Sequence, residues 1–258
     1  MKQLFALIGF LSLACGAPDA DHPLPTTAGG SSSGGAVSDG GGPVDGPNPL
    51  GRSRCKPPAG TTGSPQTIEQ AVALLNALPK PTSVACFVES LDRPLTIFST
   101  SSPFSAQPAL STKSPRVFIK SGQLWLSIVI DGDSSELIEF GYLLGDTLRS
   151  IKGELHLPLD APIAPSAPYE RVRYQSGTVC GLCHSDERPE EVPGIAGVFS
   201  TVAFRPRPDS HVQLGALALE WQACKWEQEP HRCEMLSSVF GGGQVVEGAF
   251  PSAMGTFF

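Results

Sequence analysis

The stretch 116–130 reads RVFIKSGQLWLSIVI and holds the clearest strand pattern in the chain. Apolar residues recur at every second position on both sides of Ser121-Gly122, a two-residue loop suited to a tight hairpin turn. Because side chains alternate across a strand, this spacing gives each strand one apolar face. We therefore predict antiparallel strands over residues 116–120 and 123–130, and Asp131-Gly132 marks the next chain reversal.

The alternation of apolar and polar residues continues beyond this hairpin. It continues through residues 136–143 and 147–157, and the residues from Val84 to Val88 also fit a strand. Upstream, apolar residues have the 3.6-residue spacing of an amphipathic helix, at Ile68, Val72, Leu75 and Leu78. Residues 55–157 are thus predicted to form a helix plus an antiparallel, sandwich-like β domain. This stretch contains no nucleophile–base pair, phosphate loop or carboxylate cluster, so we expect no enzyme.

Four prolines between residues 158 and 168 indicate a stiff connector. Beyond it, residues 169–258 are predicted to be mostly helical. One helix carries its apolar stripe at Leu214, Leu217, Trp221 and Cys224, and a second begins at Pro230 and ends before Gly241. The fold class is therefore α+β, with an antiparallel sheet domain followed by a small, mostly helical C-terminal segment.

The net charge of the chain helps to exclude one class of function, nucleic-acid binding. The 258 residues include 18 Lys and Arg against 25 Asp and Glu, which gives a net charge of −7. A nucleic-acid-binding protein carries a basic stripe, and no Lys/Arg run occurs here. We therefore expect no nucleic-acid partner.

The N-terminus has the pattern of an export signal. Residues 1–14 join one Lys to an apolar run and predict a signal peptide. The sequence LSLACG at residues 11–16 resembles the lipobox of bacterial lipoproteins, which implies a lipid on Cys15; Gly16 resembles lipoproteins sent to the outer membrane. Residues 15–54 then form the lipidated Cys and a Gly/Ser/Pro-rich tether. We expect a cell-envelope protein anchored to the membrane through lipid; ordinary secretion is the alternative.

The pentapeptide Cys180-Gly181-Leu182-Cys183-His184 carries the main chemical signal. It matches the attachment motif of haem c, in which two thiols bind the haem vinyl groups and the His ligates the iron. Haem c is attached outside the cytoplasmic membrane, in agreement with the predicted export. With Cys15 and this pair set aside, Cys55, Cys86, Cys224 and Cys233 can close two disulfides, one of them joining Cys224 to Cys233. Three disulfides that include Cys180 and Cys183 are the alternative.

Residues 170–258 resemble class I c-type cytochromes in the CxxCH motif and in a late Met, Met254, followed by aromatic residues. The resemblance implies one covalent haem c, His184 and Met254 as iron ligands, and electron transfer with a redox protein partner. Other candidates for the distal ligand are Met235, His211 and His231. Four acidic residues after the motif could steer a basic partner or form a solvated loop, namely Asp186, Glu187, Glu190 and Glu191.

Three other functions fit the same residues. The first is a non-redox, disulfide-stapled envelope lipoprotein with a binding or structural role. The second is thiol–disulfide exchange at Cys180 and Cys183, which requires a thiol of low pKa. The third is a zinc site at Cys180, Cys183, His184 and a distant Cys.

Overall fold

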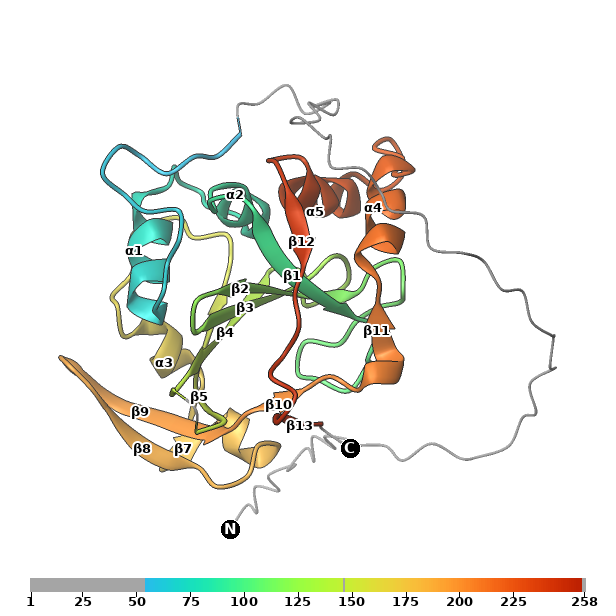
Figure 1. Cartoon of the computed structure of the whole chain (residues 1–258). Helices are drawn as coiled ribbons and strands as arrows, with labels where there is room; N and C mark the ends of the chain where they lie inside the picture. Colours follow the sequence, from blue (N-terminus) through green and yellow to red (C-terminus); the bar gives the residue numbers. More distant parts are fainter. Residues whose placement is uncertain (1–53, 146, 257–258) are drawn as a thin grey trace, which may run out of the picture. The chain divides into compact units, whose positions relative to one another are not determined.

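The computed structural model describes residues 54–145 and 147–256, which belong to one compact unit. The predicted signal peptide and Cys15 lie outside the described residues. The fold is mixed α+β, as predicted, and is built on a nine-stranded, mostly antiparallel sheet (Figure 1). No helix among the described residues is long and apolar enough to cross a membrane.

The centre of the sheet is an antiparallel meander. Its strands are β1 (Leu95–Thr100), β2 (Arg116–Ser121), β3 (Leu124–Val129), β4 (Leu137–Leu143) and β5 (Arg149–His156). The predicted hairpin is confirmed, since β2 pairs with β3 and Ile119 lies opposite Leu126. Gly122 in the turn has a φ of 61°, a backbone conformation that favours glycine.

The C-terminal segment extends this sheet at both edges. The strand β9 (Ile195–Val202) pairs with β5, and β8 (Arg188–Val192) pairs with β9. At the other edge β11 (His211–Val212) runs antiparallel to β1, and β12 (Val245–Glu247) runs parallel to it. Residues 169–258 therefore build part of the sheet as well as two helices.

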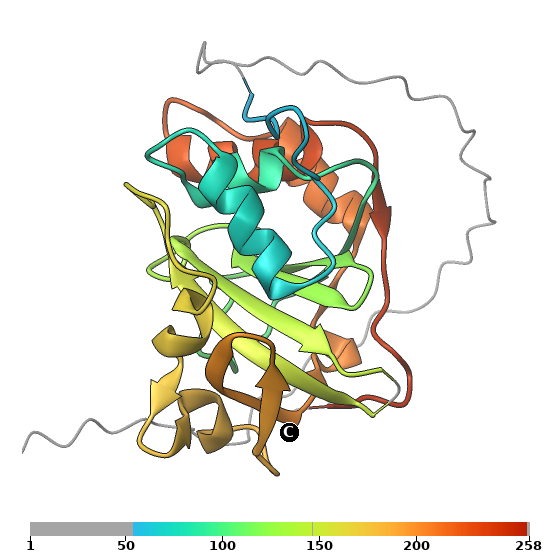
Figure 2. The ribbon, with the colours of Figure 1, turned by 90° about the vertical axis from the view of Figure 1, so that its left-hand side faces the viewer.

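Two further sheets have two strands each. They pair β6 (Arg173–Tyr174) with β7 (Gly177–Thr178), and β10 (Phe204–Arg205) with β13 (Gly255–Thr256). Figure 2 shows the short elements of residues 173–205 at the opposite end of the molecule from the longer helices.

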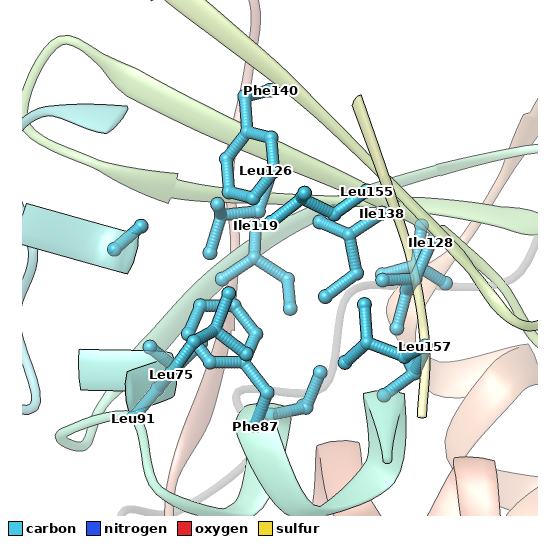
Figure 3. Close-up of a cluster of buried hydrophobic side chains, with 14 of the residues drawn as sticks. Leu75, Phe87, Leu91, Ile119, Leu126, Ile128, Ile138, Phe140, Leu155 and Leu157 are labelled. Atoms are coloured by element: carbon cyan, nitrogen blue, oxygen red, sulfur yellow. The ribbon is translucent and has the colours of Figure 1, made fainter. Parts of the chain in front are cut away.

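One face of the sheet, called the first face here, packs against helices. The helices α1 (Ile68–Ala77), α2 (Val84–Glu89), α4 (Leu214–Gln222) and α5 (Pro230–Phe240) all contribute buried residues to this core. Figure 3 shows Leu75 and Phe87 facing Ile119, Leu126 and Ile138 of the sheet. The continuous apolar contact between the two layers is the main source of stability.

The predicted strand over Val84 to Val88 is wrong, because these residues form α2. All five are buried, so their apolar run fits a helix as well as a strand. The Ser83 hydroxyl accepts a hydrogen bond from Cys86 N at 3.1 Å and thereby caps the helix. The apolar pattern of these residues does not distinguish a helix from a strand, whereas the cap at Ser83 favours the helix.

The predicted connector is packed against α1. The side chain of Asn76 makes two hydrogen bonds with the backbone of Ile163, at 2.8 and 2.9 Å. The short helix α3 (Ala167–Arg171) follows, and the Tyr169 hydroxyl donates to Glu69 on α1. The connector is thus fixed to the body of the protein.

The structure forms the two disulfides Cys55–Cys86 and Cys224–Cys233 and leaves Cys180 and Cys183 outside both. The pairing of Cys224 with Cys233 is confirmed, and the three-disulfide alternative does not form. The first disulfide joins the chain before α1 to α2, and the second joins the ends of α4 and α5.

Arg232 on α5 is the centre of a buried polar network. Its guanidinium lies 2.8 Å from Glu220 and 2.7 Å from Glu229, and it donates to Ser114 Oγ at 3.0 Å. It also donates to the carbonyl of Lys113 at 2.7 Å. This one side chain therefore links the α4–α5 hairpin to the loop before β2.

We predict that Arg232→Met lowers the free energy of unfolding by about 1–3 kcal/mol, because it removes the guanidinium hydrogen bonds to Ser114 Oγ and to the Lys113 carbonyl. Arg207 is the matched control, since its pair with Asp209 is exposed, and Arg207→Met is expected to cost less than about 1 kcal/mol. Urea denaturation checks both values. Equal costs for the two variants would contradict the structural role of Arg232.

We also predict different effects from removing the two disulfides. Their sequence separations are 31 for Cys55–Cys86 and 9 for Cys224–Cys233. Loop-closure entropy gives stabilisations of about 3–4 and about 2–3 kcal/mol respectively. Urea denaturation of the two double Cys→Ser variants is expected to show the larger loss for Cys55 and Cys86. A larger loss for the variant without Cys224 and Cys233 would show that loop-closure entropy does not set the difference in stability.

Candidate functional site

The CxxCH motif forms one helical turn. The 3₁₀-helix η1 (Val179–Leu182) starts it, and His184 N donates to Cys180 O at 2.8 Å. Side chains three and four residues apart lie on the same side of a helical turn. The turn therefore sets Cys183 and His184 about one helical turn from Cys180, with Cys183 exposed and Cys180 partly buried.

Glu187 holds the start of this turn. Its carboxylate accepts hydrogen bonds from Thr178 N at 3.1 and 3.2 Å and from the Thr178 hydroxyl. The carboxylate lies so close that a Cβ on Gly181 would be 2.9 Å from Glu187 Oε1. Gly181 lies between the two cysteines. Because it has no side chain, the carboxylate of Glu187 can pack against the turn.

His184 is held by the strand that follows it. Its Nδ1 lies 2.9 Å from the carbonyl oxygen of Val202, and its ring stacks on Phe204 with ring centroids 5.3 Å apart. A carbonyl can only accept a hydrogen bond, so Nδ1 carries the proton and Nε2 has the lone pair. This arrangement makes Nε2 the nitrogen that can bind a metal.

The electrostatic surroundings keep His184 neutral. Burial, together with the positive charges of Lys152 and Arg116, lowers the pKa of His184 to about 4, against the effect of the Val202 hydrogen bond. A metal-binding imidazole must be neutral. At neutral pH His184 is therefore in the protonation state that ligation requires.

The two cysteines differ in their surroundings. Burial raises the pKa of the partly buried Cys180 to about 11, although Lys152 nearby lowers it. Cys183 is exposed. Thiol–disulfide exchange depends on a thiol of lowered pKa, so the state of Cys180 disfavours that function. Among the described residues no group of three or more His, Cys, Asp and Glu side chains is placed to hold a metal ion, so the zinc alternative gains no support.

Met254 lies in a second hydrophobic cluster. Its side chain is 3% exposed and packs with Trp125, Leu143 and Ala203. The backbone following it passes near the motif, because Gly255 pairs with Phe204, which stacks on His184. The structure therefore brings the late Met segment close to His184 while the Met254 side chain remains packed against the sheet.

The other candidates for a distal ligand lie elsewhere. Met235 is buried in the core of the first face, and His231 is exposed at the start of α5. His211 stacks on Phe98, and its Nε2 lies 2.7 Å from Glu247. These contacts of His211 and Met235 involve no residue of the CxxCH turn.

Most of the acidic residues after the motif have structural partners. Asp186 pairs with Arg149 at 2.8 Å and with Arg188 at 2.6 Å, and the hydrogen bond from Arg188 lowers its pKa. Glu187 binds Thr178, and Glu190 accepts a hydrogen bond from the Ser200 hydroxyl. These contacts fold the segment after the motif, and the two arginines compensate the charge of Asp186.

Sequence reasoning did not identify Glu187 as the residue that holds the turn, nor Val202 and Lys152 as neighbours of His184. Glu187 is close to the motif in sequence, but its role depends on the turn of the chain at Asp186, which has a φ of 57°. Lys152 and Val202 become neighbours of the motif only through the pairing of β5 with β9.

The low pKa of His184 predicts a pH dependence of stability for the protein without any cofactor. Its pKa is about 4 in the folded chain and about 6.5 in an unfolded chain. The unfolded state therefore binds the proton first, and stability falls as the pH drops from about 6.5 to about 4. Thermal unfolding across this range is expected to show a smaller loss for His184→Asn. A His184→Asn variant that loses stability over this pH range as the wild type does would contradict this origin.

A comparison of the chain with protein families, curated proteins and solved structures finds no match.

Proposed function

We propose that the protein binds one haem c covalently and transfers electrons. Thioether bonds from Cys180 and Cys183 hold the haem, and His184 binds its iron through Nε2. The observation that carries this proposal is the orientation of His184 beside the helical turn of the motif, with its Nδ1 held by the Val202 carbonyl at 2.9 Å. That hydrogen bond fixes both the tautomer and the ring orientation of a metal ligand.

The surface around the turn suits a large apolar group. Val179 is 42% exposed and Leu182 is 63% exposed, and both belong to η1. An attached porphyrin would cover apolar area at this turn, which is favourable. The exposure of Cys183 also leaves its thiol accessible for attachment.

When bound, the haem supplies a one-electron redox centre. The chain would orient the ligating nitrogen through Val202, stack Phe204 against the imidazole and set the local charge through Lys152 and Arg116. Met254 is the proposed distal ligand by resemblance to class I c-type cytochromes. For this role its side chain must leave the cluster formed with Trp125, Leu143 and Ala203.

The proposed location follows from the sequence. We propose that a lipid on Cys15 anchors the protein in the cell envelope at the outer membrane, and that residues 15–54 tether it. The two disulfides support an oxidising compartment. A redox protein is the proposed partner.

A non-redox, disulfide-stapled lipoprotein with a binding or structural role is the second candidate. The packing of Met254 in the second hydrophobic cluster favours it, because this side chain already has a complete apolar environment. The two candidates differ in whether Cys180 and Cys183 carry a covalent group.

Haem attachment can be tested in protein produced in a periplasm with a haem-attachment system. We expect a haem that stays bound through acid–acetone extraction and denaturing electrophoresis, and a sharp α-band in the reduced state. Cys180→Ala and Cys183→Ala are each expected to weaken or abolish this retention. The double variant Cys224→Ala/Cys233→Ala is the control and is expected to keep the haem, since these residues form a separate disulfide.

A colourless wild-type protein would overturn the proposal in favour of the non-redox lipoprotein. If haem is present, Met254→Ala is expected to retain it, to lower its reduction potential and to open the iron to added ligands. The buried Met235 is the control, because Met235→Leu is expected to leave the potential unchanged.

A further inference from the structure

A small pocket lies over the second face of the sheet, opposite the helix-packed first face. It encloses about 160 Å³, and the side chains that line it come from β1, from β10, β11 and the chain between them, and from the segment after β12. Pro208 and Ala249 in its lining are exposed, so the pocket opens to solvent. No residue of the CxxCH motif lines it, so this pocket is separate from the candidate haem site.

The walls of the pocket are mainly apolar and are held in place by their neighbours. Phe250 stacks on Trp125 with ring centroids 4.2 Å apart and meets Phe98 edge to face at 5.2 Å. Pro206 and Pro208 add two rigid rings to the lining. Such walls suit a flat apolar group, and an aromatic ring gains further from its contacts with the two phenyl rings.

Arg205 supplies a positive charge to the pocket. Its Nε donates a hydrogen bond to Met254 O at 2.8 Å, and among the described residues its two Nη groups have no hydrogen bond or ion pair. Phe204, the residue before it on β10, stacks on His184. Successive side chains of a strand point to opposite sides, which agrees with Arg205 lining the pocket while Phe204 faces the motif. The guanidinium is therefore fixed through Nε and available to an anion through its Nη groups.

The acidic residues that adjoin the lining in sequence have other partners. Asp209 lies 2.6 Å from the guanidinium of Arg207, and Glu247 lies 2.7 Å from Nε2 of His211. Neither carboxylate pairs with Arg205. The pocket therefore favours a ligand that brings its own negative charge to this guanidinium.

The volume of the pocket limits the ligand to one ring. An apolar cavity of about 150 Å³ holds benzene, whereas sites for drug-sized molecules measure about 300–1,000 Å³. A guanidinium presents its N–H groups in one plane, and a carboxylate can accept two of them at once. Size, apolar walls and charge thus point to one class of molecule, a single aromatic ring that bears a carboxylate.

We propose that this pocket binds a monocyclic aromatic carboxylate. The ring contacts Phe98 and Phe250, and the carboxylate accepts hydrogen bonds from the Nη groups of Arg205. Benzoate is the simplest molecule of this class and serves as the probe. Its dissociation constant is expected to be on the order of 1 mM, because a small ligand in a pocket open to solvent makes few contacts.

Amide NMR titrations of the purified full-length chain compare three probes. Benzoate has both the ring and the charge, benzamide keeps the ring without the charge, and acetate keeps the charge without the ring. We expect benzoate to shift the amide signals of residues 205–211 and 248–250, and to bind about tenfold more tightly than either of the other two.

Three variants test the assigned contacts. Arg205→Met is expected to weaken benzoate binding about tenfold and to leave benzamide binding unchanged, which also shows that the pocket is still folded. Arg207→Met is the matched control, because this neighbouring Arg is exposed and does not line the pocket, and it is expected to keep the wild-type affinity. Ala249→Leu places a larger side chain in the lining and is expected to weaken both ring-containing probes.

Several results would overturn the proposal. One is benzoate that shifts none of these amides or binds no more tightly than benzamide. Another is an equal loss of benzoate affinity in Arg205→Met and Arg207→Met, which would show a general effect of charge. Phe257 and Phe258 follow β13 in the sequence and are the competing occupant. Benzoate binding that occurs only in the variant Phe257→Ser/Phe258→Ser would assign the pocket to them. None of these outcomes depends on haem attachment at Cys180 and Cys183.

Discussion

The pairing of β5 with β9 is the contact on which the candidate site depends. It places Ser150 opposite Thr201 and Ile151 opposite Ser200, and so joins the C-terminal segment to the central meander. The carbonyl of Val202, at the end of β9, then meets His184 Nδ1. Arg149 reinforces the contact through hydrogen bonds to Ser200 and Asp186. Without this strand pair the CxxCH turn would have neither the acceptor that orients its imidazole nor the layer of side chains beside it.

The sheet is covered on both faces, and the two faces differ in chemistry. All six residues of β3 are buried, as expected for a strand with packing on either side. The first face is continuous apolar core beneath the helices. The second face mixes aromatic rings with charges: Phe250 stacks on Trp125 with ring centroids 4.2 Å apart, while Arg116 pairs with Glu139 nearby. The first face thus holds the main apolar core, and the second face holds the charged groups that lie near the candidate site.

The charges of the second face act on the candidate site as a group. Lys152 and Arg116 both lower the pKa of His184, and Lys152 also opposes the effect of burial on Cys180. Burial is the main reason that the imidazole is neutral, and these two positive charges add to its effect.

The sequence by itself determined the features that depend on short-range geometry. These are the hairpin around Gly122, the helices α1 and α5, the pairing of Cys224 with Cys233, and the CxxCH residues, which one helical turn brings together. The run from Val84 to Val88 was predicted to be a strand because five consecutive apolar residues fit the repeat of a strand and that of a helix. The hydrogen bond from Cys86 N to the Ser83 hydroxyl stabilises the helix. Only the tertiary structure decided that Met254 packs against Trp125, that the acidic residues after the motif bind Arg149 and Thr178, and that Lys152 lies beside His184. The physical reason is that a local pattern records which face of an element is apolar, whereas the contacts of polar side chains depend on which strands pair.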